Sequence, residues 1–447
     1  MASEAEQFQR TFSRRNFVLG VANGALFIFA STLIDPATVL PSYALDLTGA
    51  VMGVGLLASV VAAGWAWPPA LLAGVMERAP SRLFYYRLFA VFRITAAWLA
   101  AWVVLGSRRG EVGALWMLVA LLFIMTSCGG ASLLAFMTVV SDSIPPRVRG
   151  RFFGMRYFFG GLLSLAGGAY VKHLLSPAAR ELFPNNYAIL FAGAAAVTTV
   201  ALALFSFCEE FPHTVRRRSL PPLAQLRRGG RLLVRDKDYR NIVVARLLLW
   251  LTSGLALPFM VPFAVNELGI EQEAVGIFLS VMVLAYSLSN VLWSYLSDGP
   301  GNRILLLISG ACYLAVPAMA LTAPFIPAQP TVGFLGLQAG PVFWWILAAF
   351  ALSGLAKAGQ MMGHTNYLLE LSPEPSRPTY LSFYYATGLP LTFLPIVGAV
   401  IIGQEGRYEL GFAFSLIISV LMLWVLRGLR EVRVNNNGEG HSSSGHK

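Results

Sequence analysis

Long apolar runs, separated by short polar connections, make up most of this chain. A helix needs about 20 mainly apolar residues to cross the hydrocarbon core of a bilayer, and each run is near or above that length. The pattern predicts twelve transmembrane helices near residues 17–43, 52–75, 83–105, 113–140, 152–175, 187–207, 241–265, 274–296, 304–324, 341–369, 380–402 and 408–426. We therefore expect an all-α polytopic membrane protein, with a break at Asp35-Pro36 in its first helix.

The two halves of the chain are related in sequence. The segment from Ser141 to Gly154 returns in relaxed form 228 positions later, and a second register has an offset of 221 positions. The first register pairs Asp142 with Glu370, Pro145 with Pro373 and Arg149 with Arg377, and the second pairs Pro41 with Pro262, Asp46 with Glu267, Glu77 with Asp298 and Arg82 with Arg303. Two related halves with six spans each predict parallel repeats about an axis along the membrane normal.

The pattern divides the chain into four regions. Residues 1–208 and 241–426 are the two six-helix halves, and residues 209–240 are a basic linker with nine Lys and Arg residues. Residues 427–447 form a polar tail that we expect to be disordered. The leucine-studded part of the linker, residues 223–234, is compatible both with a helix on an anionic inner leaflet and with a solvated loop.

Composition agrees with a membrane protein. The 447 residues are 56% hydrophobic and 12% charged, whereas soluble domains have about 25% charged residues. The net charge is +11, and most of the 33 Lys and Arg residues lie in the N-terminal tail, alternate loops and the C-terminal tail. By the positive-inside rule we expect both termini to be cytoplasmic, in a monomer that spans the inner (plasma) membrane. No soluble domain carries the basic residues, so we expect no nucleic-acid partner.

A charged hinge recurs between consecutive spans, as an acid, a Pro and an Arg in each half. The Pro ends a helix, and the Arg is expected to stay just outside the bilayer. We expect inner-face ion pairs that close the cytoplasmic side, and this cytoplasmic gate consists of Asp142 with Arg149 or Arg151, Glu370 with Arg377 or Arg303, and Asp298.

Ionisable side chains inside the spans are the candidate chemistry. A charge at the bilayer centre costs about 2.5–3.5 kcal/mol on insertion scales, so such a group is expected to face protein or water and to have a function. The groups that meet this description are Asp35, Arg93, Lys357 and His364. Lys357, Gln360 and His364 follow one another at steps of three and four, which predicts one polar helical face.

Asp35 is the only acid well inside a span, and we expect it to carry a coupling proton. The alternative is a permanent ion pair of Asp35 with Lys357 or with the intramembrane Arg93, which only holds helices together. Lys357 has a similar alternative, in which it pairs with a group on the first or seventh helix. Arg246 lies one turn inside its span, and we expect its side chain to reach the inner surface.

Two halves of six spans, a basic linker and both termini inside together resemble the major facilitator superfamily. Residues 295–303 resemble the loop motif Gly-x-Leu-x-Asp-Arg-x-Gly-Arg-Arg of that family, with Asp298, Gly301 and Arg303 in place. The resemblance implies that the first, fourth, seventh and tenth helices line a central cavity, about which the halves rock. On that basis Lys357, Gln360 and His364 are the expected substrate-binding residues.

We expect a secondary transporter that moves a small anionic or zwitterionic solute by alternating access, with protons as the candidate coupling ion. The sequence has no nucleotide-binding loop and no nucleophile-base constellation, so we expect neither an enzyme nor a cofactor. Cys128, Cys208 and Cys312 lack metal-ligand spacing, so we expect no metal. One alternative is a multidrug-type exporter whose larger apolar cavity is lined by Trp65, Trp67, Trp250 and Phe259. The other is a non-transporting membrane receptor or assembly factor on the same scaffold.

Overall fold

A computed structural model describes residues 2–77, 81–144, 146–176, 179, 181–210, 222–327, 332–334, 337–372, 377–403 and 405–431. Helices dominate this part of the chain, as the apolar runs predict. The first half contains α1 (Ala2–Leu33), α2 (Val39–Thr48), α3 (Val51–Glu77), α4 (Arg82–Gly106), α5 (Val112–Ser143), α6 (Pro146–Leu174) and α8 (Asn185–Ser206).

The second half is preceded by α9 (Pro222–Arg235), which lies in the basic linker. It continues with α10 (Lys237–Ala256), η1 (Leu257–Phe259), α11 (Met260–Asn266), α12 (Ala274–Asp298), α13 (Asn302–Thr322), η2 (Ala323–Phe325), α14 (Pro341–Leu371), α15 (Arg377–Ala386), η3 (Leu389–Phe393), α16 (Leu394–Ile402) and α17 (Tyr408–Arg427). Between η2 and α14, β1 (Val332–Phe334) and β2 (Leu337–Ala339) pair as an antiparallel hairpin. This hairpin is a small departure from the all-α prediction.

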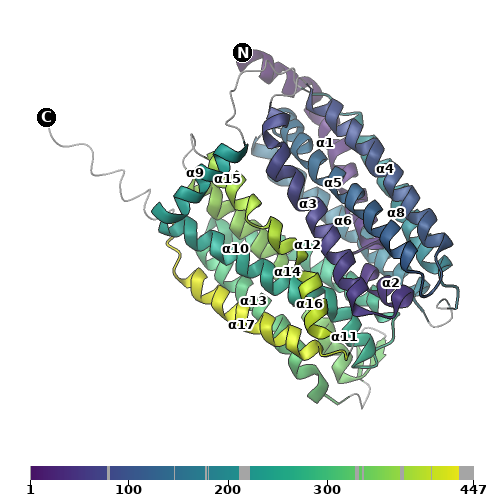
Figure 1. The fold of residues 1–447 in the computed structure, drawn as a ribbon. Helices are drawn as coiled ribbons and strands as arrows, with labels where there is room; N and C mark the ends of the chain where they lie inside the picture. The colour runs from purple at the N-terminus through teal and green to yellow at the C-terminus, as the bar shows by residue number, and fades with distance from the viewer. Residues whose placement is uncertain are drawn as a thin grey trace.

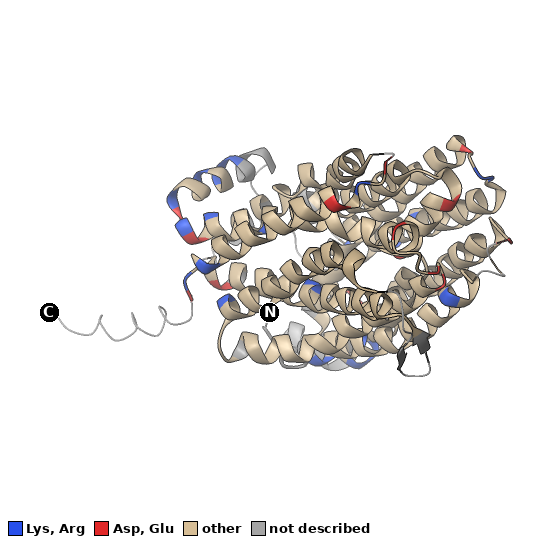
Figure 2. Ribbon diagram, turned by 90° about the horizontal axis from the view of Figure 1, so that it is seen from below, with Lys and Arg blue, Asp and Glu red and all other residues tan. Residues whose placement is uncertain are grey.

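Within the described residues, eleven helical segments are long and apolar enough to cross a membrane. They coincide with all the predicted spans except the fifth. The fifth corresponds to α6, whose 29 residues make a helix of about 43 Å at 1.5 Å per residue. Arg156 and several glycines lower its apolar character. Figure 2 shows that charged residues gather toward the two ends of the bundle, with long uncharged stretches of helix between them.

Prolines break three of the predicted spans. The first span divides into α1 and α2 around Pro36, which confirms the predicted break, and the seventh divides into α10 and α11 around Pro258. The eleventh divides into α15 and α16, with η3 and Pro390 between them. Proline lacks the amide hydrogen of the helical ladder, so each break leaves backbone carbonyl groups that need other partners.

The two halves lie side by side as two bundles (Figure 1). We call the end with Arg15, Glu210 and Glu431 the inner end, and the end with Asp46 and Gln272 the outer end. The halves meet where α6 packs on α12 and where α3 packs on α16. Glycine permits both contacts. At the α6–α12 contact, a Cβ on Gly168 would collide with the carbonyl oxygen of Gly276, and at the α3–α16 contact, a Cβ on Gly55 would collide with the carbonyl oxygen of Pro395.

The buried core differs between the two ends. At the outer end one apolar cluster runs through both halves, from Val39 and Leu118 in the first half to Phe263 and Phe343 in the second. At the inner end each half has its own cluster, around Phe152 in the first half and around Tyr367 in the second. The apolar core is therefore continuous between the halves at the outer end and divided at the inner end, where the halves still touch because α3 contacts α9 and α15.

A carboxylate from the end of each half caps a helix at the inner end. In the first half, Glu210 accepts hydrogen bonds from the backbone nitrogens of Arg82 (2.7 Å) and Leu83 (3.0 Å), at the start of α4. In the second half, Glu431 accepts one from the backbone nitrogen of Arg303 (3.1 Å), at the start of α13. The offset between the two acids is 221 residues, which is the second repeat register. Negative charge at a helix N-terminus stabilises the helix.

We predict that Glu210→Ala and Glu431→Ala each destabilise the fold, because unsatisfied helix N-terminal amides typically cost about 0.5–2 kcal/mol. The apparent midpoint of thermal unfolding in detergent should fall for each variant, and the two losses should add because the sites are far apart. Glu271→Ala is the control, since this exposed outer acid caps no long helix. Unchanged midpoints in both cap variants would refute the capping role.

Candidate functional site

Asp35 lies in the break between α1 and α2, where it is half-buried. Its Oδ1 accepts hydrogen bonds from the backbone nitrogen of Ala37 (2.9 Å) and from Oγ1 of Thr38 (3.0 Å). Its carbonyl oxygen also accepts one from the backbone nitrogen of Leu40 (3.0 Å). The helix break thus supplies donors to the carboxylate, and the positive charge of Lys357 acts on it from the second half. The structure forms no direct Asp35 ion pair with Lys357 or Arg93 in the part of the chain that it describes.

Lys357 lies near the middle of α14 with an exposed side chain. Within the described residues no acceptor lies at hydrogen-bonding distance of its ammonium group. An exposed ammonium in the middle of a membrane-spanning helix requires water or a ligand around it, because lipid offers no acceptor at that depth. Its three donors are therefore free for a solute.

Gln360 has a different environment from Lys357. Its side chain is buried, and its Nε2 donates to the carbonyl of Leu306 (2.9 Å) and to Oγ of Ser309 (2.9 Å), both on α13. A step of three residues turns a helix about 60° away from the starting face. That turn directs Gln360 into the α13–α14 contact, so the structure does not bring all three predicted substrate-binding residues together.

His364 lies about 20° from Lys357 around α14 and two turns closer to the inner end. It is only 3% exposed, and neither ring nitrogen has a hydrogen-bond partner among the residues that the structure describes. Its ring lies 6.2 Å from that of Tyr384 on α15. A buried imidazole with no partner is costly, which makes this position a candidate for contact with a ligand or a water molecule.

Arg246, on α10, joins His364 in this inner cluster. Its guanidinium carbon lies 4.3 Å from the ring centroid of Tyr384 and 5.0 Å from that of Tyr385. Its Nε is buried and has no hydrogen-bond partner in the described part of the chain. The expectation that Arg246 only reaches the inner surface is therefore incomplete, because its head group packs on aromatic rings. The sequence showed only how deep Arg246 lies along its helix, and depth does not give the direction of a side chain.

The first half also has an arginine that lies over an aromatic ring, but this arginine comes from a different helix than in the second half. Arg156 on α6 lies with its guanidinium carbon 4.5 Å from the ring centroid of Phe136 on α5. In the 228-residue register, Arg156 corresponds to Tyr384 and Phe136 to His364. In the second half Arg246, from α10, therefore supplies the cation that Arg156 supplies in the first half. Arg156 also donates to Asn23 Oδ1 (3.3 Å), which leaves it more completely bonded than Arg246.

Arg93 is buried in the first half, away from Asp35. Its guanidinium carbon lies 4.8 Å from the ring centroid of Phe27 and 5.3 Å from that of Trp65. Gly129 makes room for this group, because a Cβ there would meet both Trp65 and Arg93. Aromatic faces stabilise a desolvated cation, so Arg93 holds α1, α3, α4 and α5 together.

The apolar residues of the exporter alternative do not share one surface in this conformation. Phe259 is fully buried in the outer core, and Trp65 packs on Arg93. Trp67 donates from its ring nitrogen to Oγ of Ser127 (2.8 Å) within the first half. Trp65 and Trp67 thus contribute to packing inside the first half, and Phe259 to the cluster that both halves share.

Most of the predicted cytoplasmic gate lies outside the described residues, since the side chains of Asp142, Arg149, Asp298 and Arg377 are not described. Arg151 is exposed. Arg303 donates from its side chain to the carbonyl of Arg427 (3.1 Å), and Glu370 is half-buried with partners of its own. Arg303 therefore connects the start of α13 with the end of α17 within the second half.

A polar cluster closes the outer end across the two halves. The Oδ2 of Asp46, on α2, accepts hydrogen bonds from the hydroxyl of Tyr187 (2.8 Å) and from Nε2 of Gln272 (2.9 Å). Gln272 belongs to the second half and the other two residues to the first. We call these three residues the outer latch. Sequence reasoning found Asp46 only as a repeat position, and its partners are too distant in sequence to be predicted.

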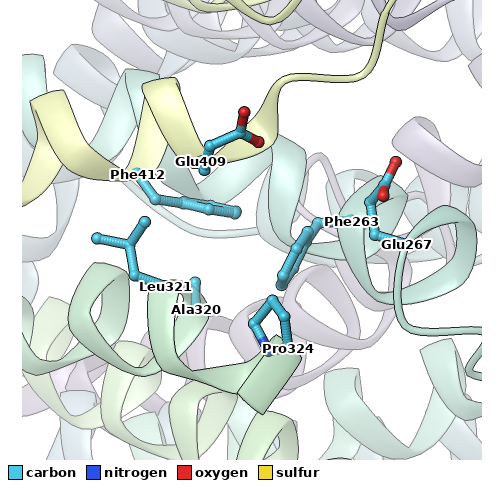
Figure 3. A pocket seen from close by; sticks show the side chains of 7 residues that line it. All are labelled: Phe263, Glu267, Ala320, Leu321, Pro324, Glu409 and Phe412. Carbon is cyan, nitrogen blue, oxygen red and sulfur yellow. The ribbon is translucent and has the colours of Figure 1, made fainter.

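A small pocket also lies at the outer end, between α11, α13 and α17. Its volume is about 130 Å³, and it is lined by Phe263, Glu267, Ala320, Leu321, Pro324, Glu409 and Phe412. Figure 3 shows the rings of Phe263 and Phe412, which pack edge to face with centroids 5.0 Å apart, and the carboxylates of Glu267 and Glu409 at the rim. Ligand pockets usually have about 300–1,000 Å³, so we do not assign solute binding to this pocket.

Comparisons with known proteins agree with the fold. The family model described as Major Facilitator Superfamily matches residues 242–444. The structure of a D-xylose-proton symporter is similar with a TM-score of 0.67 and 15% identity, over 94% of this chain and 99% of that chain. A mutant of the nucleoside transporter NupG gives a TM-score of 0.67 and 14% identity, over 93% of this chain and 99% of that chain. No curated protein matches the sequence.

A third similar structure has been solved in two states. A bacterial homologue of the iron transporter ferroportin gives a TM-score of 0.61 in its inward-facing state, at 16% identity over 93% of this chain and 98% of that chain. Its outward-facing state gives a TM-score of 0.55. The chain is thus an integral, multi-pass membrane protein with the fold of secondary transporters. The Major Facilitator Superfamily model matches the second half of the chain, and the similar structures extend the likeness in fold over both halves.

We predict that Gln272→Ala weakens the outer latch and raises the population of an outward-open form. A hydrogen bond to a charged group contributes about 1.5–3 kcal/mol, which corresponds to a roughly tenfold or larger shift between two states. Spin labels at Val112 and Glu271, both exposed at the outer end, should report longer distances in double electron-electron resonance. Glu273→Ala, one residue along the same loop, is the control. Identical distance distributions in wild type and Gln272→Ala would contradict the latch.

Proposed function

We propose that this protein moves a small anionic or zwitterionic solute across the inner (plasma) membrane by alternating access, coupled to protons. The observation that carries the proposal is the exposed ammonium of Lys357, which lacks an acceptor in the described part of the chain at mid-depth on α14. Charge-assisted hydrogen bonds to a carboxylate or phosphate are the strongest that an ammonium makes. A solute with such a group offsets the cost of placing a charge at mid-depth in the membrane.

We further infer that the observed conformation faces inward. Three observations support this: the outer latch, the apolar cluster shared by both halves at the outer end, and their separate clusters at the inner end. The higher TM-score with the inward-facing ferroportin homologue also agrees. In this proposal both termini are cytoplasmic, the inner end is the cytoplasmic end and the protein acts as a monomer.

Two cationic positions suggest a route for the anionic group. Lys357 stands at mid-depth, and Arg246 lies beside His364, which is two turns closer to the inner end, or about 10 Å. In the proposed inward-facing state the solute moves from Lys357 toward Arg246 and His364, whose unpartnered nitrogens can donate to it. Gln360 supports this site by fixing α14 against α13 instead of contacting the solute.

Asp35 is the proposed proton carrier. When ionised, it competes with an anionic solute for the positive charge of Lys357, which acts on it. When protonated, it leaves that charge to the solute, so a proton and an anion bind in a mutually favourable way. The expected mode is therefore symport, in which a lower external pH increases uptake. Arg93 and the cytoplasmic gate residues, from Asp142 to Arg377, contribute packing and closure in this proposal.

The proposal predicts that Lys357→Met folds but binds the anionic solute about ten- to 150-fold more weakly, since losing a charge-assisted contact costs about 1.5–3 kcal/mol. Proteoliposomes loaded with a pH-sensitive dye can screen carboxylates, phosphates and zwitterions for proton-linked uptake, and the apparent affinity is then compared. Lys357→Arg should rescue only partly, because its fork has a different geometry. Lys237→Met, at an exposed inner position, is the matched control.

Unaltered affinity in Lys357→Met, or a bulky cation as the transported solute, would contradict the anion site and favour the exporter. Absence of flux for every solute class would favour a non-transporting receptor or assembly factor. These outcomes distinguish the site assignment from the class of function.

A separate prediction concerns Asp35→Asn, which keeps the shape of the side chain but cannot ionise. Exchange of labelled solute across the membrane at equal concentrations should continue, because binding and rocking do not require a net proton movement. Uphill accumulation driven by a pH gradient should disappear. If Asp35→Asn accumulates solute with a normal pH profile, Asp35 serves only to stabilise the break between α1 and α2, and the proton carrier lies elsewhere.

A further inference from the structure

We propose that the basic face of α9 is a binding site for anionic phospholipid headgroups of the inner leaflet, and that its occupancy favours the observed conformation. We define this basic face by Arg227, Arg228, Arg231 and Arg235, all of which are exposed. The inference depends on the inner end being cytoplasmic, but not on the solute.

The spacing of these arginines concentrates positive charge on one side of the helix. At 100° per residue, their positions fall within an arc of about 100°. Within the described residues, Val234 lies at the edge of this arc and is 80% exposed. A face with several arginines and an exposed apolar residue suits the boundary between headgroups and acyl chains. Figure 2 shows basic residues gathered on the short helices at this end of the molecule.

The opposite side of α9 is attached to the protein. Leu232 and Leu233 pack against the inner core of the second half. Gly229 is buried against α15, where an added Cβ would collide with Phe383. Helix α9 is therefore a docked element with a defined outward side, which selects between the two possibilities that the sequence left open for this segment.

The depth of α9 agrees with a headgroup site. Phe383 is the first residue of the apolar span Phe383–Ile402, and it is the residue that packs on Gly229. Helix α9 thus lies level with the start of an apolar span, where a bilayer places its phosphates. Arginine side chains can reach such phosphates from this position and bind them with their planar fork.

The contacts of α9 connect this site to helices that must move in transport. At its end, Asp236 caps α10 by accepting from the backbone nitrogen of Tyr239 (3.0 Å), and it also accepts from the hydroxyl of Tyr380 on α15 (3.3 Å). The hydroxyl of Tyr239 donates to the carbonyl of Tyr380 (2.8 Å). Helix α9 also touches α3 of the first half. Lipid that holds α9 in place therefore holds α10, α15 and α3 in their present arrangement.

Lipid retention tests the site itself. The purified full chain, in nanodiscs of phosphatidylcholine with and without about 30% phosphatidylglycerol, is released into native mass spectrometry to count retained anionic lipids. The combined variant Arg227→Gln, Arg228→Gln and Arg231→Gln should retain at least threefold less phosphatidylglycerol than wild type. The control is Arg108→Gln with Arg407→Gln, two exposed arginines at the outer end. Equal retention by wild type and the combined variant would overturn the proposal.

The effect of lipid on the outer-end distances tests the coupling between the basic face of α9 and the conformation. With spin labels at Val112 and Glu271, phosphatidylglycerol should reduce the fraction of long outer distances at least threefold in wild type and not in the combined variant. Gly229→Leu keeps every charge but displaces α9 from Phe383, and it should also lose this lipid response. A lipid response that persists in both variants would show that anionic lipid acts elsewhere, and it would overturn the assignment to α9. Neither measurement uses the solute, so their failure is distinguishable from failure of the transport proposal.

Discussion

The cost of placing charge inside a low-dielectric interior constrains this molecule more than any other factor. Arg93, Arg156 and Arg246 meet that cost by lying over aromatic rings. Asp35 meets this cost because the helix break at Pro36 supplies hydrogen-bond donors to its carboxylate. Lys357 has only the charge of Asp35, which acts on it without a direct contact, and it has no aromatic face or hydrogen-bond acceptor among the described residues. A charge at mid-depth that lacks a direct partner among the described residues is expected to stand in water, and the proposal of an anionic solute follows from this expectation.

The repeat explains how the halves are built and also where they differ. Glu210 and Glu431 cap equivalent helices at equivalent positions, as a duplicated unit would require. The cation-aromatic clusters occupy equivalent places too, but their cation comes from α6 in the first half and from α10 in the second. Asymmetry is therefore concentrated in α10 and α14. The second half carries the charged path, while the first half supplies Asp35 and a closely packed support.

Periodicity and proline predicted the helices, their order and the broken first span, because hydropathy and the missing amide act locally. The side-chain partners depended on packing between distant segments. Steps of three and four placed Gln360 near one face with Lys357, but the close approach of α13 directs it elsewhere. The sequence likewise gave no sign that Asp46 meets Gln272, 226 positions away. The prediction that Arg246 reaches the inner surface used only its depth in the span, and depth does not tell a surface position from a position among aromatic rings.

The central claim is that Lys357 stands in an aqueous space that opens to one side of the membrane at a time. The most direct test places a single cysteine at position 357 in a chain without Cys128, Cys208 and Cys312, and adds a membrane-impermeant thiol reagent to each side of oriented vesicles. The account predicts rapid labelling from the side of the termini and slow labelling from the other side, reversed when the outer latch is removed. Absence of labelling from either side would contradict it, because the side chain would then face lipid or a sealed contact.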